Sequence, residues 1–109
     1  MSSAPPTDTF ENATAVVERA RERASVRFSA TVPDGWQQGA GAFGGVVLGA
    51  LARAMDAAQG DASRRLRALQ GEVLAPVQPG EVDVMVELLR VGKGMSFVDA
   101  RMRAGGEVV

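Results

Sequence analysis

The residue types in the chain limit the chemistry that it can perform. Its 109 residues include no His, no Cys and no Tyr. This composition excludes a reactive thiolate, a Cys/His zinc site, a His general base and a Ser-His-Asp triad. Any catalysis would therefore use carboxylates, amides, hydroxyls or backbone groups, and we expect no metal and no cofactor.

Two consecutive glycines are the strongest candidate for a binding site. Gly44 and Gly45 precede a predicted helix over residues 46–58. The first N–H groups of a helix are unpaired and lie at the positive end of its dipole, so they can polarise a carbonyl or stabilise an oxyanion. The alternative is that the glycines only allow close packing where the loop enters the helix.

The loop before this helix supplies further candidates. Trp36 and Phe43 flank it and could line a small-molecule pocket, or they could pack in the core. Gln37 and Gln38 lie in the same loop. Their amides could hydrogen-bond a ligand or orient a water molecule, or they could be exposed loop amides.

Charged residues beyond the loop offer weaker candidates. Asp56 is the only acid on the predicted helix, but the rise of about 1.5 Å per residue places it roughly 15 to 17 Å from the glycines. That is too far to act on a carbonyl held there, so we expect a surface carboxylate with Arg53 as a candidate partner. Arg64, Arg65 and Arg67 could bind phosphate groups or form a solvated segment.

The hydrophobic pattern indicates which elements position these residues. A weak period of three to four predicts a helix over residues 8–23, and strict alternation predicts a strand over residues 24–32. The helix over residues 46–58 is apolar nearly all round its first two turns, so it must be wrapped on most sides. Gly49 within it would let another element approach closely.

Three strands are expected in the second half, over residues 66–74, 81–91 and 95–104, with the clearest alternation in residues 81–91. Gly105-Gly106 is typical of a two-residue hairpin turn, yet only three residues follow it. The last strand therefore looks truncated, and the strand before it would be an unpaired edge unless another chain covers it.

This order of elements predicts an α+β domain at residues 8–109, after a disordered arm at residues 1–7. A curved antiparallel sheet would wrap one long central helix. A domain of this size has a modest core, so we expect residues 81–91 or 95–104 to contribute to an interface with a partner subunit or domain.

Charge and composition bound the partners and the location. The formal net charge is −1, with 46% hydrophobic residues, which favours neither nucleic acid nor an anionic membrane as a partner. The longest apolar run, residues 40–52, is shorter than the roughly 20 residues of a membrane span, and no secretory signal is visible. The absence of cysteines is compatible with the cytoplasm, where we expect the protein.

Three segments resemble one family, the type II acyl-CoA thioesterases, which have a double hotdog fold. Residues 43–51 are similar to its FGG-x-V-x-G-x-A-L signature, which opens the central helix, and residues 74–80 to a segment that ends in Pro-Gly before the third strand. Residues 87–101 resemble its E-x-L-R-x-G-x-S-F-x-x-R segment, with one extra residue in the turn. The resemblance covers about residues 25–109.

The resemblance implies a hotdog domain, the first of two repeats, that takes part in hydrolysis of an acyl-CoA thioester to a carboxylic acid and CoA. It implies a place in fatty acid metabolism, and as partners an acyl-CoA or related thioester and either a second hotdog repeat or another copy in a dimer. The implied substrate-binding residues are Gly44, Gly45, Phe43, Trp36 and Gln38.

The catalytic residues of that family lie in the second repeat, so the resemblance assigns none here. Related single-hotdog thioesterases often carry a carboxylate about seven residues after the second glycine, where this chain has Ala52. A non-catalytic acyl-binding or assembly module therefore stays open as the alternative. A hotdog dehydratase or hydratase is disfavoured, because those enzymes usually need a catalytic His.

Overall fold

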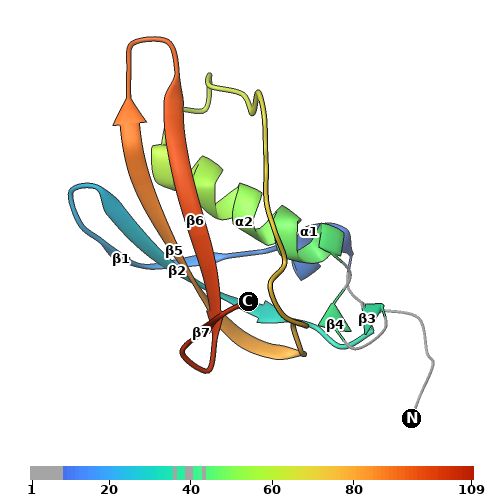
Figure 1. Cartoon of the computed structure of the whole chain (residues 1–109). Helices are drawn as coiled ribbons and strands as arrows, with labels where there is room; N and C mark the ends of the chain where they lie inside the picture. The colour runs from blue at the N-terminus through green and yellow to red at the C-terminus, as the bar shows by residue number, and fades with distance from the viewer. Residues whose placement is uncertain (1–8, 36, 39–40, 43) are drawn as a thin grey trace.

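A curved antiparallel sheet wraps one long helix in the computed structural model (Figure 1). The structure describes residues 9–35, 37–38, 41–42 and 44–109, with the backbone alone at 37–38 and 41–42. The main sheet has the order β1-β2-β5-β6-β7, and a two-stranded sheet pairs β3 with β4. The expected α+β class, with a curved antiparallel sheet around a long helix, is confirmed.

The elements have the following bounds. The helices are α1 (Phe10–Ala13) and α2 (Gly44–Gln59). The strands of the main sheet are β1 (Val17–Arg21), β2 (Ser25–Val32), β5 (Gly80–Val91), β6 (Ser96–Ala104) and β7 (Glu107–Val108). The small sheet consists of β3 (Gln37–Gln38) and β4 (Gly41–Ala42), which immediately precede α2.

Alternation along the strands creates the core. Phe28 of β2 is paired with Val84 of β5 and Val26 with Val86, and all four side chains are buried. Because side chains alternate across a strand, the intervening residues lie on the outer face of the sheet. The inner face packs on α2 through small side chains such as Ala54, which is fully buried. Three of the four strands expected from the sequence are observed with nearly the expected bounds: β2, β5 and β6.

The prediction of a close approach at Gly49 is also confirmed. A Cβ atom added there would lie 2.8 Å from Cγ2 of Thr14 and 3.0 Å from Cζ of Phe10. The short helix α1 therefore packs directly against the backbone of α2. Contact at this distance leaves no room for a side chain at position 49.

The helix predicted over residues 8–23 is wrong for most of its length. The helix ends at Ala13, and β1 follows and pairs with β2 from Val17↔Ser29 to Arg21↔Val26. The backbone N–H of Glu22 donates to the carbonyl of Ser25, which closes the turn between the strands. The backbone ladder outweighs a weak helical period in a segment of mixed charge.

The strand predicted over residues 66–74 is also wrong. This segment runs beside the sheet without strand pairing (Figure 1). It is largely exposed and touches α2 at Gly71, where an added Cβ would lie 2.6 Å from Leu48. A strand needs a partner in a backbone ladder, and no strand in the described part of the chain pairs with this segment.

The glycine pair forms the expected hairpin turn. Gly105 and Gly106 have φ values of 60° and 88°, which a two-residue turn of this kind requires and which glycine adopts without strain. The turn joins β6 to the short β7, which pairs only Arg103↔Val108 and Ala104↔Glu107. Most of the outer edge of β6 therefore carries no strand partner among the described residues.

Candidate functional site

The start of α2 is the best-formed candidate site. Gly44 and Gly45 are its first two residues, both half-buried, and its first turn holds no acidic residue. Among the residues that the structure describes, a Cβ added at Gly44 would meet no heavy atom within 4 Å. Close packing against these residues therefore does not explain glycine at this position. The N–H groups of the first turn can donate hydrogen bonds to a ligand oxygen placed in the open space beside it.

The other predicted members of this site are only partly placed. Trp36 and Phe43 lie outside the described residues. Gln37 and Gln38 form β3, which pairs with β4 in the register Gln37↔Ala42 and Gln38↔Gly41, and their side chains are outside the description. The backbone of Gln38 therefore belongs to a small hairpin that leads into α2 (Figure 1).

Asp56 does not belong to the site. It is exposed near the other end of α2 and accepts a hydrogen bond from Nε2 of Gln59 at 3.4 Å. The candidate pairing with Arg53 is not formed, because Arg53 donates instead to Oγ1 of Thr14 at 3.1 Å and to the carbonyl of Glu11. Within the described ranges, no group of acidic side chains is arranged to hold a metal ion.

Three arginines expected together have separate roles. Arg64 is half-buried and donates to Oγ of Ser96 at 2.7 Å and to the backbone oxygens of Gly92 and Lys93 at 2.6 and 3.0 Å. These bonds tie the loop after α2 to the β5–β6 hairpin and occupy the guanidinium. Arg65 and Arg67 are exposed, so the structure does not form a single basic cluster.

Asp61 completes the contacts of Arg64. Its carboxylate lies 3.3 Å from Nε of Arg64 and accepts hydrogen bonds from the hydroxyl and backbone N–H of Ser63 at 2.6 and 3.0 Å. The Ser63 hydroxyl, followed by the Ser63 backbone N–H, holds the pKa of Asp61 below its usual value, and the Arg64 charge acts in the same direction. We refer to Asp61, Ser63, Arg64 and Ser96 as the Arg64 cluster.

Sequence reasoning missed a large groove beside β6. It has a volume of about 1300 Å³ and lies between α2, residues 61–72 and residues 93–100. Apolar side chains from all three parts line it, among them Leu51, Met55, Leu69, Val98 and Ala100. The groove brings together segments that are far apart in sequence, so no local sequence signal could have located it. We call this feature the β6 groove.

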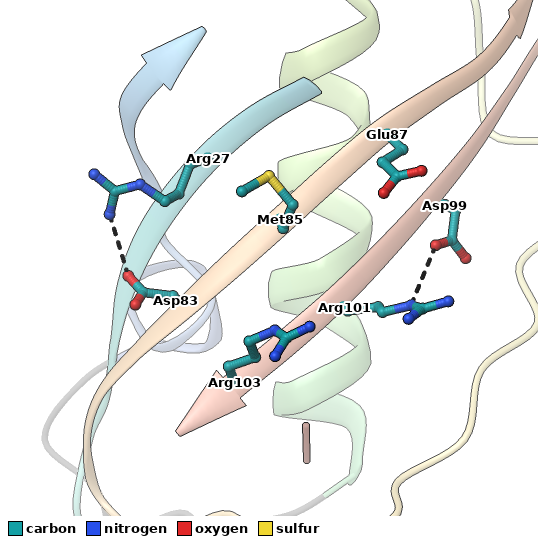
Figure 2. Close-up of a pocket in the computed structure, with 7 residues that line it drawn as sticks. All are labelled: Arg27, Asp83, Met85, Glu87, Asp99, Arg101 and Arg103. Carbon is teal, nitrogen blue, oxygen red and sulfur yellow. Dashed lines mark hydrogen bonds and ion pairs between the residues drawn. The ribbon is translucent and has the colours of Figure 1, made fainter. Parts of the chain in front are cut away.

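The outer face of the sheet carries a different surface. Figure 2 shows acidic and basic side chains from β2, β5 and β6 arranged around Met85, on the side away from α2. The carboxylate of Asp83 lies 3.5 Å from Arg27, and that of Asp99 lies 3.7 Å from Arg101. Water weakens these exposed ion pairs. Their opposite charges offset each other, so the face presents no strong field of one sign.

Comparisons with known proteins agree with this architecture. The model of the acyl-CoA thioesterase N-terminal domain family matches residues 32–109. A search of curated proteins gave no match.

No helix in the described residues is long and apolar enough to cross a membrane.

Solved structures share the fold. A thioesterase-type, phenylacetic acid degradation-related protein of Ralstonia eutropha JMP134 matches with a TM-score of 0.77 and 19% identity, over 95% of this chain and 85% of that chain. A conserved protein of Pseudomonas aeruginosa gives 0.74 and 17%, over 94% and 86%. A thioesterase of Haemophilus influenzae gives 0.73 and 14%, over 94% and 76%. The expected hotdog fold is confirmed.

Proposed function

Because the chain belongs to the acyl-CoA thioesterase N-terminal domain family, we propose that it is the N-terminal hotdog half of a type II acyl-CoA thioesterase. The whole enzyme would hydrolyse an acyl-CoA thioester to a carboxylic acid and CoA, in fatty acid metabolism in the cytoplasm. The observation that carries the proposal is the open space beside Gly44, at the start of a helix that the sheet wraps. Residues 8–109 would be the first of two repeats.

The start of α2 would act on the thioester carbonyl. The carbonyl oxygen would accept hydrogen bonds from N–H groups in the first turn, near Gly44 and Gly45, at the positive end of the helix dipole. Water adds to the carbonyl carbon, and the negative charge that forms on its oxygen is stabilised by the same groups. The C–S bond then breaks, and the proton taken from the water passes to the departing CoA thiolate. Trp36, Phe43 and Gln38 would line the substrate channel beside it.

The general base would come from outside this chain. Ala52 stands where related single-hotdog enzymes carry a carboxylate, and the first turn of α2 holds no acid. Asp56 lies about 17 Å along the helix from Gly45 by the helical rise. A second hotdog repeat would supply the carboxylate and complete the site.

The second candidate function is a non-catalytic hotdog module that binds acyl groups or assembles with another domain. The observation that favours it is the same alanine at position 52, since a site without a base can bind a thioester and leave it intact. The two candidates differ in whether CoA is released.

The test measures free thiol release from a panel of acyl-CoA substrates. The panel includes phenylacetyl-CoA, because one structural neighbour is named for phenylacetic acid degradation. The chain is assayed alone and together with a second hotdog domain. We expect hydrolysis only in combination. Binding without hydrolysis in both samples would favour the module, and an absence of binding would contradict both candidates.

Replacement of Gly44 tests the role of the helix start. Gly44→Val places a branched side chain in the open space, so we expect kcat/KM to fall by at least about tenfold, or 1.4 kcal/mol. Gly94→Val is the matched control, because a Cβ at Gly94 also meets nothing within 4 Å and the β5–β6 hairpin lies away from the start of α2 (Figure 1). Equal activity in both variants would remove Gly44 from the site.

A further inference from the structure

The β5–β6 hairpin and the loop after α2 lie at the same end of the molecule (Figure 1). The guanidinium of Arg64 joins them, because it donates hydrogen bonds to the carbonyls of Gly92 and Lys93. The start of α2, which holds the candidate site, lies toward the opposite end (Figure 1). We refer to residues 64–67 and 90–95 together as the hairpin tip. The tip is therefore a surface separate from the candidate site.

The charge of the chain is distributed unevenly. Its formal net charge is −1, from 12 basic and 13 acidic residues. Residues 62–71 and 88–98, which contain the hairpin tip, hold five of the basic residues and none of the acidic ones. The net charge of the whole chain, which favours no anionic partner, thus conceals one end of the molecule that is basic.

Most of the cations at the tip are available to an external anion. Arg64 is engaged by its contacts with Asp61 and with the hairpin. The other four basic side chains are exposed, and none of them forms an ion pair with a residue that the structure describes: Arg65, Arg67, Arg90 and Lys93. No carboxylate in direct contact neutralises these four charges within the described part of the chain.

Large apolar side chains lie among these cations. Leu66 is 67% exposed, Val91 is 58% exposed and Met95 is 49% exposed. Exposed apolar area of this kind is unfavourable in water and indicates a contact with another surface. Cations beside apolar side chains suit the interface of an anionic bilayer, where lipid headgroups bind the cations and the boundary of the acyl layer takes up the apolar groups.

We propose that the hairpin tip docks the protein on the surface of an anionic phospholipid bilayer. The four available cations contact the headgroups, and Leu66, Val91 and Met95 enter the interfacial layer. A nucleic acid would bind the cations but leave these apolar side chains in water, whereas a bilayer accounts for both sets. The contact does not need Leu89 and Phe97, which lie outside the tip. It is also independent of the proposed hydrolase activity.

Co-sedimentation with lipid vesicles tests the proposal. The vesicles contain phosphatidylcholine alone, or phosphatidylcholine and phosphatidylserine in equal amounts. Each basic residue near an anionic surface contributes about fivefold in affinity, so we expect at least about tenfold tighter binding to the mixed vesicles. Added salt should weaken this binding. Equal binding to both kinds of vesicle, or binding to neither, would overturn the proposal.

Neutralisation of a single cation separates the tip from the overall charge. Lys93→Gln should weaken binding to the mixed vesicles by about fivefold. Arg103→Gln is the matched control, because Arg103 is also exposed and forms no ion pair with a described residue. It lies roughly 23 Å along β6 from Ser96, which is beyond a Debye length of about 10 Å. Equal losses in the two variants would contradict docking through the tip.

Substitution of a methionine tests insertion of the apolar side chains. Met95→Ser should weaken binding to the mixed vesicles by at least about threefold, because less apolar area enters the interface. Met85→Ser makes the same change on the outer face of the sheet, where Met85 is 38% exposed (Figure 2), and should leave binding unchanged. If Met95→Ser alters the sedimentation of the lipid-free protein but not its binding to vesicles, the tip contacts a protein and the proposal is wrong.

Discussion

Arg64 joins parts of the chain that are far apart in sequence. Its partner Ser96 lies 32 positions away, and Gly92 lies 28 positions away. Three of its contacts are charge-assisted hydrogen bonds to a hydroxyl and two backbone carbonyls, which are stronger than neutral ones. The side chain is 21% exposed, so solvent only partly replaces these bonds when they are lost.

Removal of this side chain should lower stability. Arg64→Ala breaks the contacts to Ser96, Gly92 and Lys93, and we expect the free energy of unfolding to fall by about 1 to 3 kcal/mol. Urea unfolding with a fluorescence readout measures the change. Arg65→Ala is the control, since Arg65 is exposed and its removal should cost less than about 0.5 kcal/mol. Similar losses in both variants would mean that the Arg64 contacts contribute nothing.

The carboxylate of Asp61 should make stability depend on pH in acid. Hydrogen bonds from Ser63 lower its pKa in the folded state below the reference of 3.8. A lowered folded pKa means that the stabilisation is present above the unfolded pKa and is lost as pH falls through the folded one. Carbon-detected NMR titration should show that Ser63→Ala raises this pKa. In Asp61→Asn the decrease of Tm below about pH 4 should be smaller than in the wild type.

These residues differ in how far sequence could identify them. The position of Gly44 and Gly45 at the start of a helix was predicted because a helix start is a local feature that a short stretch of sequence specifies. The role of Arg64 was missed, because it depends on a hairpin 28 to 32 positions away. The same holds for Arg53, whose partner Thr14 lies 39 positions away on α1. A sequence pattern records residue types and spacing, and contacts of this range require the fold.

Among the elements, burial on one face decides which strands the sequence can predict. β5 alternates between buried and exposed positions from Glu81 to Glu87, and its pattern was recognised. β1 is exposed at all five of its residues, so no alternation marks it. Its place in the sheet depends on the backbone ladder with β2 and on Arg21, which donates to the carbonyl of Ala58 at 3.2 Å.

The prediction of a strand over residues 66–74 failed for the opposite reason: the residue types suit a strand, but the segment has no strand partner. It has apolar residues suited to a strand, including Leu66 and Leu74, which are 67% and 65% exposed. What it lacks is a neighbouring strand to pair with along its length. Residue composition predicts that a segment can form a strand, but backbone pairing with a neighbouring strand decides whether it does.

The contact between the two helices gives a test at this scale. Gly49→Ala would place a methyl group 2.8 Å from Thr14, a buried residue of the α1 C-cap. We expect the free energy of unfolding to fall by about 1 to 3 kcal/mol from overpacking, with α1 displaced from α2. Gly44→Ala is the matched control on the same helix, because its methyl group meets no described residue within 4 Å. A stabilising Gly49→Ala would show that α1 is not held there.

At the scale of the whole molecule, the single core leaves apolar side chains uncovered at one end. Leu89, Val91, Met95 and Phe97 surround the β5–β6 hairpin and are 63, 58, 49 and 53% exposed. Large apolar side chains left exposed near one another are candidates for an interaction surface. The outer face beside them carries balanced charge around Met85. Together these features suit a partner that buries apolar area without a strong electrostatic requirement.

Association through β5 and β6 follows as the last prediction. Sedimentation velocity at micromolar concentration should detect a species heavier than the 11.4 kDa chain, because burial of apolar area contributes about 25 cal/mol per Å². Phe97→Glu should shift the distribution toward the monomer. Val17→Glu is the control, since Val17 is 52% exposed, close to Phe97 at 53%, but lies on β1 at the far edge of the sheet. If Val17→Glu alone dissociates the protein, the contact runs through β1, and a wild-type monomer at this concentration would contradict association altogether.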